Sequence, residues 1–402
     1  MGSSAPIHVY TGVVHPERKA IFRADAPPKS MIKDGRKEAI LACTKCGKAG
    51  NDEQPVKKCA RCGLTYYCSQ QCQRNDWQNH KPNCSSELGE GIHPLIKSVT
   101  GNPMISHYIQ LCIALEYSLH RLHGLPAAQR RAVIRQPRSV HIDVGVEPSM
   151  IAEFMTLYTY PDDWDKDDME GMLQFHHLSR PDQWVPPREL SPNDIVIWSQ
   201  ARADADEDGD QECAVVLVKF LNNFKQCITC PFVVDDEALG QARRNMPFTM
   251  GSAITGKSTD KPLSVATCFE YLNTHIRADK KNHLLLRAPM RPSDKELIRD
   301  AGRQKDEHAP RMLRLKMSRE GVYVSHPISA LNTVATRKEA PRNQTRRTES
   351  ANANPLPESR QIEGEPQEST DALQETREPS TMNRAERRRQ QQEQKKAAKR
   401  RK

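Results

Sequence analysis

Eight residues that can bind a metal ion lie within only 42 residues, and this cluster constrains the fold more than any other feature of the chain. They are Cys43, Cys46, Cys59, Cys62, Cys68, Cys72, His80 and Cys84. Their spacing reads C-x2-C, C-x2-C, C-x3-C and H-x3-C. A structural zinc ion takes four thiolate or imidazole ligands, and ligands two to four residues apart can chelate one ion together. The stretch therefore predicts two complete tetrahedral zinc sites.

The same stretch contains too few apolar residues to fold without metal. Between Cys43 and Cys84, the only large aliphatic side chains are those of Val56 and Leu64. Because so little apolar surface can be buried, the free energy of zinc binding is also the free energy of folding. A disulfide cluster is the alternative. Disulfides would require a secretory context, of which the sequence gives no sign, and they would leave His80 unexplained.

The order of the ligands and the residues between them carry further information. From Tyr67 to Cys84 the chain reads Tyr-Cys-Ser-Gln-Gln-Cys-Gln-Arg-Asn-Asp-Trp-Gln-Asn-His-Lys-Pro-Asn-Cys. This segment resembles the MYND zinc finger, in which a tyrosine precedes the fifth ligand and a Cys-Gln-x-x-Asp-Trp-x-x-His-Lys run leads to the last cysteine. The resemblance covers residues 43–84, about a tenth of the chain, and includes every ligand.

The resemblance implies a cross-braced arrangement, which spacing alone does not distinguish from sequential pairing. The implied ligand sets are Cys43, Cys46, Cys68 and Cys72 for one ion, and Cys59, Cys62, His80 and Cys84 for the other. A local argument agrees. Ser69 is a good N-cap and residues 70–80 contain no Pro or Gly, so a short helix is expected there. Cys72 and His80 would lie about 12 Å apart on it, and would bind different ions.

Both ligand sets are complete, so neither ion has an open position for water or substrate, and both ions are expected to be structural. The resemblance further implies that the finger binds proline-containing peptides of partner proteins through Gln73 and Trp77. Such extended peptides lose little conformational entropy when they dock on an aromatic side chain. The alternative is that Trp77 only covers the small core of the finger, because buried and binding tryptophans look alike in a sequence.

The remaining sequence predicts a second, larger folded region. Residues 1–40 have few periodic apolar positions and are expected to form a loosely ordered N-terminal extension. Residues 92–330 are expected to form an α+β domain of unknown function. Its clearest helix starts at Asn102 and Pro103, and its clearest strand is 140–146, where Val and Ile alternate with polar residues as in a half-buried strand. Further helices are expected at 151–158 and 264–276, and further strands at 195–198, 214–221 and 224–234.

Three smaller motifs in this domain are interpreted as structural. The acidic run at 204–210 imitates half of an EF-hand loop, but Val215 stands where a bidentate Glu is needed, so we expect an acidic hairpin tip. Cys227 and Cys230 form a lone C-x2-C whose members would face opposite sides of a strand, which favours two core cysteines. The His176-His177 pair has no partner at motif spacing. No catalytic motif is recognised in the domain.

The C-terminal region has the composition of a disordered tail. No aromatic residue follows Tyr323, and residues 335–402 cannot assemble a core. From Arg384 to Lys402 the chain carries a net charge of +8, of +9 for the whole sequence. This basic end, residues 383–402, is typical of weak, sequence-independent contact with nucleic acid, of a nuclear import signal, or of a solvated end without a specific role.

The sequence predicts a zinc-binding interaction or adaptor protein of the nucleus or cytoplasm, without membrane association. The cysteine usage suits a reducing compartment, and the chain has no apolar N-terminal stretch and no transmembrane run. Its MYND finger would recruit a protein partner through proline-containing peptides, and the chain is not expected to be an enzyme.

The alternative function is that of a lysine methyltransferase of the SET-MYND type. Those enzymes resemble one another in a Gly-x-Gly segment before the finger and an Asn-His-Ser/Cys motif after it. Here residues 1–42 contain no such glycine pair, and Asn282-His283 is followed by Leu284. A cofactor that needs close approach of the backbone needs those glycines, so this alternative is disfavoured.

Overall fold

The computed structural model describes residues 16–38, 42–48, 50, 54–63, 65–84, 91–223, 226–251 and 258–324. We refer to residues 43–84 as the finger and to residues 16–38 with 91–324 as the body. The finger contains a two-stranded antiparallel ladder, one helix and a short 3-10 turn. Their bounds are β1 (Lys57–Lys58), β2 (Tyr66–Tyr67), α3 (Gln70–His80) and η1 (Lys81–Asn83).

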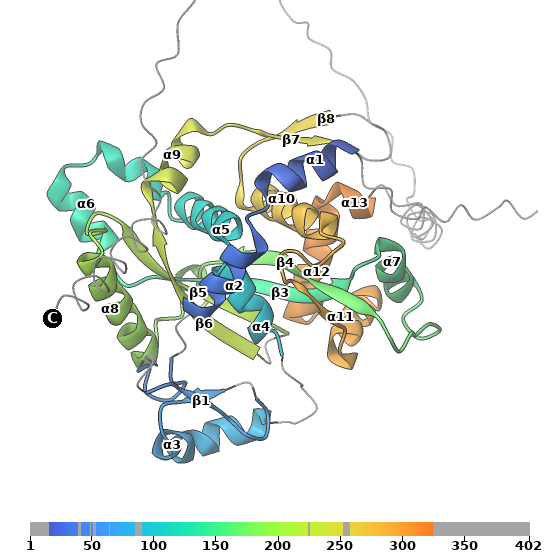
Figure 1. Cartoon of the computed structure of the whole chain (residues 1–402), viewed down its shortest axis with the longest axis horizontal. Helices are drawn as coiled ribbons and strands as arrows, with labels where there is room; N and C mark the ends of the chain where they lie inside the picture. The colour runs from blue at the N-terminus through green and yellow to red at the C-terminus, as the bar shows by residue number, and fades with distance from the viewer. Residues whose placement is uncertain are drawn as a thin grey trace, which may run out of the picture. The chain divides into compact units, whose positions relative to one another are not determined.

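The body is built on a mixed sheet of five strands with the order β6-β5-β3-β4-β9, which Figure 1 shows as one twisted layer. The central strand β3 pairs in parallel with β5 and antiparallel with β4, while β6 and β9 add antiparallel strands at the two edges. β7 and β8 form a separate ladder. The bounds are β3 (Ser139–Pro148), β4 (Glu170–Ser179), β5 (Ala214–Asn222), β6 (Gln226–Val234), β7 (Phe248–Gly251), β8 (Ser258–Lys261) and β9 (Arg287–Pro289).

Helices surround this sheet and confirm the predicted α+β class (Figure 1). Two predicted helices of the body begin at capping side chains, since the side chain of Asn102 accepts the N–H of Ile105 and that of Ser264 accepts the N–H of Thr267, each at 3.1 Å. The helices of the body after the finger are α4 (His93–Thr100), α5 (Pro103–Glu116), η3 (Leu119–Gly124), α6 (Ala127–Ile134), α7 (Ile151–Thr159), η4 (Pro181–Gln183), α8 (Pro192–Glu207), α9 (Asp236–Arg244), α10 (Val265–Ala278), α11 (Pro292–Gly302), α12 (His308–Arg319) and α13 (Gly321–Val324).

The central strand is buried more deeply than its sequence pattern predicts. All ten residues of β3 are buried, although alternation of apolar and polar residues predicted a strand with one wet face. The polar face meets other side chains instead of water. Asp143 lies 3.1 Å from His308, and Glu147 lies 2.6 Å from Lys316, both on α12. The alternation in β3 therefore separates an apolar layer from a polar layer that is also buried.

The predicted strand at 195–198 is wrong, because these residues lie inside α8. Ser191 and Asp194 form a capping box at the start of this helix, with Asp194 N–H donating to Ser191 Oγ at 3.2 Å and Ser191 N–H donating to Asp194 Oδ2 at 2.9 Å. The acidic run at 204–210 is likewise the end of α8 and the turn at Gly209, not the tip of a hairpin.

The expectation of a loosely ordered N-terminal extension is wrong for residues 16–38, which form α1 (Pro16–Asp25) and α2 (Lys29–Glu38). Ile32 is fully buried in the main core, and Phe22 packs against that core. α2 also approaches the end of α4 so closely that a Cβ on Gly35 would lie 2.7 Å from Gly101. Among the side chains that the structure describes in these helices, Phe22 of α1 and Ile32 of α2 contact the core, which is too few to create a periodic signal in the sequence.

Some predicted segments lie outside the described residues. These include the tail at 335–402 with its basic end, and also residues 1–15 and 39–41. Within the part of the chain that the structure describes, no helix combines the length and the apolar character needed to cross a membrane.

Candidate metal centre

The eight predicted ligands come together as two groups of four. Within each group, the possible ligand atoms all lie within 4.8 Å of one another. The groups are the two sets that the MYND resemblance implies, namely Cys43, Cys46, Cys68 and Cys72, and Cys59, Cys62, His80 and Cys84. The cross-braced pairing is therefore confirmed, and sequential pairing is excluded.

The separations between ligand atoms fit zinc. Cys46 Sγ lies 3.6 Å from Cys68 Sγ, and Cys62 Sγ lies 3.5 Å from His80 Nε2. With Zn–S and Zn–N distances of about 2.3 and 2.0 Å, tetrahedral coordination places two sulfur ligands about 3.8 Å apart, and a sulfur and a nitrogen ligand about 3.5 Å apart. The finger thus has two zinc-binding sites, and the protein fills all four positions of each.

Two tight turns hold the first ligand pair of each site. The N–H of Gly47 donates to the carbonyl of Cys43 at 2.8 Å, and the N–H of Gly63 donates to the carbonyl of Cys59 at 2.9 Å. Gly47 and Gly63 have φ angles of +72° and +66°, in a region where residues with a side chain are strained. These turns bring both cysteines of each C-x2-C pair to the same side of the chain.

The helix α3 separates the two sites, as predicted. Ser69 caps it by accepting the N–H of Cys72 on its Oγ at 3.2 Å. Cys72 stands in the first turn of α3 and His80 is its last residue. The two ligands belong to different groups, so a single helix links both zinc sites.

The electrostatics of the two groups favour a bound cation. Burial and, to a smaller extent, neighbouring cysteines raise the pKa of Cys68 to about 12 and that of Cys84 to about 11. Burial also raises the pKa of Cys43, but nearby backbone N–H groups outweigh burial and bring this pKa to about 7. Burial lowers the pKa of His80, which keeps its ring neutral. Several thiolates can share each small volume only with a divalent cation, so zinc binding releases protons.

A tyrosine, and not the tryptophan, completes the small core of the finger. Tyr67 is buried together with the ligand cysteines. Its hydroxyl donates to Asp76 Oδ2 at 2.8 Å, and Asp76 is itself buried. This bond ties the end of β2 to the middle of α3. Asp76 belongs to the recognised Asp-Trp pair, but its structural role could not be derived from spacing alone.

Trp77 lies on the outer side of α3. It is 37% exposed and is not part of the core cluster of the finger. Beside it, the surface is hollowed to a volume of about 360 Å³, and this hollow is lined by Gln70, Gln73, Arg74 and Trp77. The two residues predicted to contact a peptide, Gln73 and Trp77, therefore share one hollow on one helix.

Two other parts of the finger, its first turn and β2, contact the body. The side-chain amide of Asn193 on α8 donates to the carbonyl of Thr44 at 3.0 Å. The hydroxyl of Tyr66 lies 3.0 Å from Nδ1 of His93, the first residue of α4. At Gly47, a Cβ would come within 3.2 Å of Val196. These contacts join positions far apart in the sequence, which is why motif spacing did not predict them.

The other cysteines that the sequence analysis singled out are not ligands. Cys227 and Cys230 lie on β6. Cys230 is half-buried, but Cys227 is exposed, so the expectation of two core cysteines is wrong for Cys227, which lies on an edge strand. Among the described residues, only the two groups in the finger place three or more possible ligands together.

Comparison with known proteins divides the chain at the same place. A model of the MYND finger family matches residues 43–84, and a model described as a domain of unknown function (DUF8205) matches residues 90–323. Curated proteins match around the finger. Hypoxia-inducible factor prolyl hydroxylase of Caenorhabditis elegans is 39% identical over 56 residues, which is 14% of this chain and 8% of that protein.

Two further relatives also match only a short segment of this chain. Egl nine homolog 1 of Homo sapiens is 38% identical over 55 residues, 13% of this chain and 12% of that protein. N-lysine methyltransferase SMYD2 of Mus musculus is 43% identical over 44 residues, 10% of each chain. This chain thus spans about a tenth of the length of the curated relatives it matches. No solved structure matches the chain.

Proposed function

We propose that this chain, which belongs to the DUF8205 family and carries a MYND finger ahead of the family domain, is an interaction protein that recruits protein partners through the finger. The two zinc sites are complete, so the metal has a structural role and leaves no position for catalysis. What the finger offers to a partner is a surface, and the outer side of α3 is the part of that surface best suited to a ligand.

The exposure of Trp77 carries this proposal. Had Trp77 served only as a cover for the finger, it would lie in the core with the ligand cysteines. That place is taken by Tyr67. An indole ring that stays in contact with water, beside the amide of Gln73 and the hollow they share, favours a role in binding over a role in folding.

The chemistry of this hollow favours an extended peptide that contains proline. A flat aromatic ring packs well against a pyrrolidine ring, and a neighbouring side-chain amide can donate to and accept from the peptide backbone. A proline-containing peptide is already extended before it binds and therefore loses little conformational entropy. We propose that Trp77 packs on the proline and that Gln73 hydrogen-bonds to the adjacent backbone.

The enzymatic names of two relatives do not bear on the body. The prolyl hydroxylase and the N-lysine methyltransferase share with this chain only a segment about the size of the finger. We therefore propose that the chain is not an enzyme of either type. Calorimetric titration with S-adenosylmethionine tests the methyltransferase alternative directly, and sub-millimolar affinity would restore it.

The peptide proposal is tested by comparing two substitutions on one helix. Trp77→Ala removes the exposed ring, and Gln78→Ala changes an exposed neighbour that does not line the hollow. Both variants should keep two zinc ions, which elemental analysis can verify. We expect proteins captured by the wild type and by Gln78→Ala to be lost with Trp77→Ala. Synthetic peptides from a captured protein should lose affinity when proline is replaced by alanine. Equal capture by all three proteins would contradict the proposal.

For the basic end, residues 383–402, we propose at most weak, sequence-independent contact with nucleic acid, and for the chain a nuclear or cytoplasmic location. The high local charge supports attraction to phosphates, and binding of this kind should weaken steeply as salt is raised. Imaging a fluorescent fusion with and without residues 383–402 separates an import signal from the other roles.

A further inference from the structure

A cavity of about 400 Å³ opens in the body where β4, the first turn of α10 and the last turn of α12 meet. Small-molecule sites in proteins have volumes of about 300–1,000 Å³. One part of its lining is apolar and includes Leu178 and Val265. Another part is polar and includes His176, Lys316 and Arg319. The cavity lies entirely within the body, and the function proposed for the finger does not use it.

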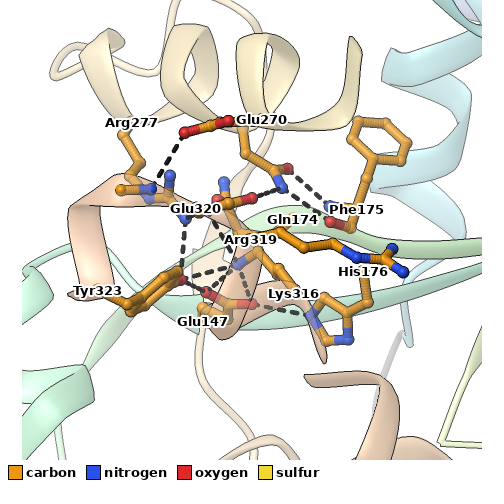
Figure 2. Close-up of polar contacts among 12 residues, drawn as sticks. Glu147, Gln174, Phe175, His176, Glu270, Arg277, Lys316, Arg319, Glu320 and Tyr323 are labelled. Carbon is orange, nitrogen blue, oxygen red and sulfur yellow. Dashed lines mark hydrogen bonds and ion pairs between the residues drawn. The ribbon is translucent and has the colours of Figure 1, made fainter. Parts of the chain in front are cut away.

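A buried carboxylate organises the polar side of this cavity. Glu147 on β3 is contacted by Lys316 Nζ, at 2.6 and 2.7 Å from its two oxygens, by the hydroxyl of Tyr323 at 2.6 Å and by His176 Nε2 at 2.8 Å (Figure 2). All four side chains are buried. Burial raises the pKa of Glu147, but the charge of Lys316 and the hydrogen bond from His176 outweigh burial and hold this pKa well below its usual range. Glu147 is therefore an anion.

A second buried carboxylate extends the cluster to α10. Glu320 accepts hydrogen bonds from Arg277 Nη2 at 2.7 Å and from the side-chain amide of Asn273 at 2.6 Å. The side-chain amide of Asn273 also pairs with the backbone of Phe175 on β4, at 2.8 Å to its N–H and 2.7 Å to its carbonyl. Two carboxylates and two cations thus balance within the cluster, and they fix β4, α10 and α12 around the cavity.

The cluster fixes which nitrogen of His176 contacts Glu147. An ionised carboxylate only accepts hydrogen bonds, so the Nε2 of His176 must carry the proton that Glu147 accepts. Because Nε2 is committed to Glu147, the other ring nitrogen, Nδ1, is the one left to a ligand. It has no hydrogen-bond partner among the described residues. The ring also packs closely on Gly145, since a Cβ at that position would lie 2.5 Å from its Cε1.

The cavity is lined by both hydrogen-bond donors and acceptors. Arg319 is exposed, and its guanidinium makes no ion pair with any described residue. Val265 and Ala266 belong to the first turn of α10, where backbone N–H groups have no partner within the helix and favour an anion. On the acceptor side are His176 Nδ1 and the half-buried carboxylate of Glu116. An anionic group and a hydrogen-bond donor would both find partners here.

We propose that this cavity binds a small carboxylic acid that has an apolar body and carries a hydroxyl or amino group. The carboxylate pairs with Arg319 and the first turn of α10, the hydroxyl or amino group donates to His176 Nδ1, and the apolar body packs on Leu178 and Val265. A buried ion cluster adds little net stability compared with apolar packing. Its role here is to hold His176 and the cavity walls in place.

The test is a calorimetric titration of the full-length, zinc-loaded chain with three matched compounds. 3-Phenyllactate has the carboxylate, the hydroxyl and an apolar ring, 3-phenylpropionate lacks the hydroxyl, and 3-phenyllactamide lacks the charge. We expect saturable binding of 3-phenyllactate, affinity about fivefold weaker for 3-phenylpropionate, and affinity roughly tenfold weaker or more for 3-phenyllactamide. Failure of the wild type to bind any of the three saturably would overturn the proposal.

Two exposed arginines on α12 provide a matched pair of variants. Arg319→Glu reverses the charge at the cavity, and Arg311→Glu makes the same change two turns away, outside the lining. Both variants have the same net charge, so any binding of the anion by the basic tail is equal in the two. We expect affinity for 3-phenyllactate to fall roughly tenfold or more in Arg319→Glu alone. Equal affinities in the two variants would contradict the assigned site.

A third variant fills the space instead of changing its charge. Ala266 lines the cavity and is only half-buried, so Ala266→Phe should place its ring in the cavity without removing any partner of the ion cluster. Circular dichroism establishes that it folds. Loss of 3-phenyllactate binding is the expected result, and binding equal to that of the wild type would place the ligand elsewhere.

Discussion

The finger and the body stabilise buried charge in opposite ways. In the finger, thiolates gather in two groups that contain no cationic side chain, and the compensating charge must come from bound zinc. In the body, the carboxylates of Glu147 and Glu320 are compensated by Lys316 and Arg277 of the same chain. The finger therefore depends on zinc taken from solution for its fold, whereas the body supplies its counter-charges from its own side chains.

The two regions differ in their apolar cores as well. The core of the finger consists of ligand cysteines and Tyr67, with Val56 packed against them. The body has a main core that includes every apolar residue of β3 and reaches Ile32 near the N-terminus, and a second apolar cluster where α8 packs on β5 and β6. Loss of one metal ligand should consequently unfold the finger, whereas loss of one charge should only weaken the body, and the following predictions test this difference.

The largest effect is expected at the zinc ligands. Cys59→Ser and His80→Ala each leave one site with three ligands. A structural zinc ion contributes about 10–16 kcal/mol in small zinc-dependent folds, so either change should unfold the finger. The body should stay folded because its apolar core does not include residues of the finger. Elemental analysis should return two zinc ions for the wild type and fewer for each variant, while circular dichroism retains the signal of the body.

A cysteine outside the finger serves as the control for this prediction. Cys227 is exposed on β6 and belongs to neither ligand group. Cys227→Ser should therefore keep both zinc ions and the stability of the wild type. A wild-type protein with one zinc ion, or with none, would contradict the two-site assignment. Unfolding of the body together with the finger would contradict the independence of the two regions.

The finger could be predicted from sequence because its information is local. Ligand spacing, the cap at Ser69 and the resemblance to a known finger all lie within residues 43–84. Its contacts with the body were not predictable in this way, since Thr44 meets Asn193 and Tyr66 meets His93. Such contacts depend on the relative placement of segments, which no local pattern encodes.

Several elements of the body were predicted correctly, since the predicted segments 151–158, 214–221 and 224–234 correspond to α7, β5 and β6. One predicted strand was wrong. The short apolar run at 195–198 predicts a strand wrongly, because four residues cannot distinguish the helical period of 3.6 residues from the strand period of two. The signal that identifies the helix was present just upstream, as Ser191, Pro192 and Asp194.

The ion cluster left no comparable trace in the sequence. Glu147 and Lys316 are separated by 169 residues in the sequence. Taken alone, each of them predicts only an ordinary charged residue. The sequence likewise gives no functional signal for His176, because its partners are distant in sequence. Buried charge clusters of this kind become visible only once the fold brings their members together.

The second largest effect is expected inside that cluster. Lys316→Met leaves Glu147 buried without its main cation, and removal of one partner of a buried pair destabilises a protein by about 3–5 kcal/mol. Chemical unfolding of the body should show this loss, with zinc content unchanged. Adding Glu147→Gln should recover part of the stability, because the uncompensated charge is gone. The control is exposed Lys305, which pairs with the half-buried Asp300, and Lys305→Met should change little.

A third, smaller effect concerns pH. The folded state holds the pKa of Glu147 below its ordinary value of about 4.3. Its contribution to stability is therefore fully present above pH 4.3 or so and is lost as pH falls below that value toward the folded pKa. In the background Trp77→Phe, the remaining tryptophans at 164, 184 and 198 report on the body alone. We expect acid unfolding of Lys316→Met to begin from a lower stability but with a shallower slope. Equal slopes would show that Lys316 does not set the pKa.

The smallest effect is expected at the junction between finger and body. Burial lowers the pKa of His93 to about 4, so its ring is neutral at neutral pH, and its contact with the hydroxyl of Tyr66 joins two uncharged groups. Such a bond contributes about 0.5–1.5 kcal/mol. Tyr66→Phe should lower the stability of the junction by no more than this, whereas Tyr160→Phe, on the exposed surface of the body, should change nothing.

Titration with a zinc chelator, followed by measurement of the thermal midpoint of the body, tests this effect. If the two regions are independent, Tyr66→Phe makes zinc slightly easier to remove and leaves the midpoint of the zinc-free body unchanged. A large fall in that midpoint would instead show that the junction, and not the separate cores, holds the body together.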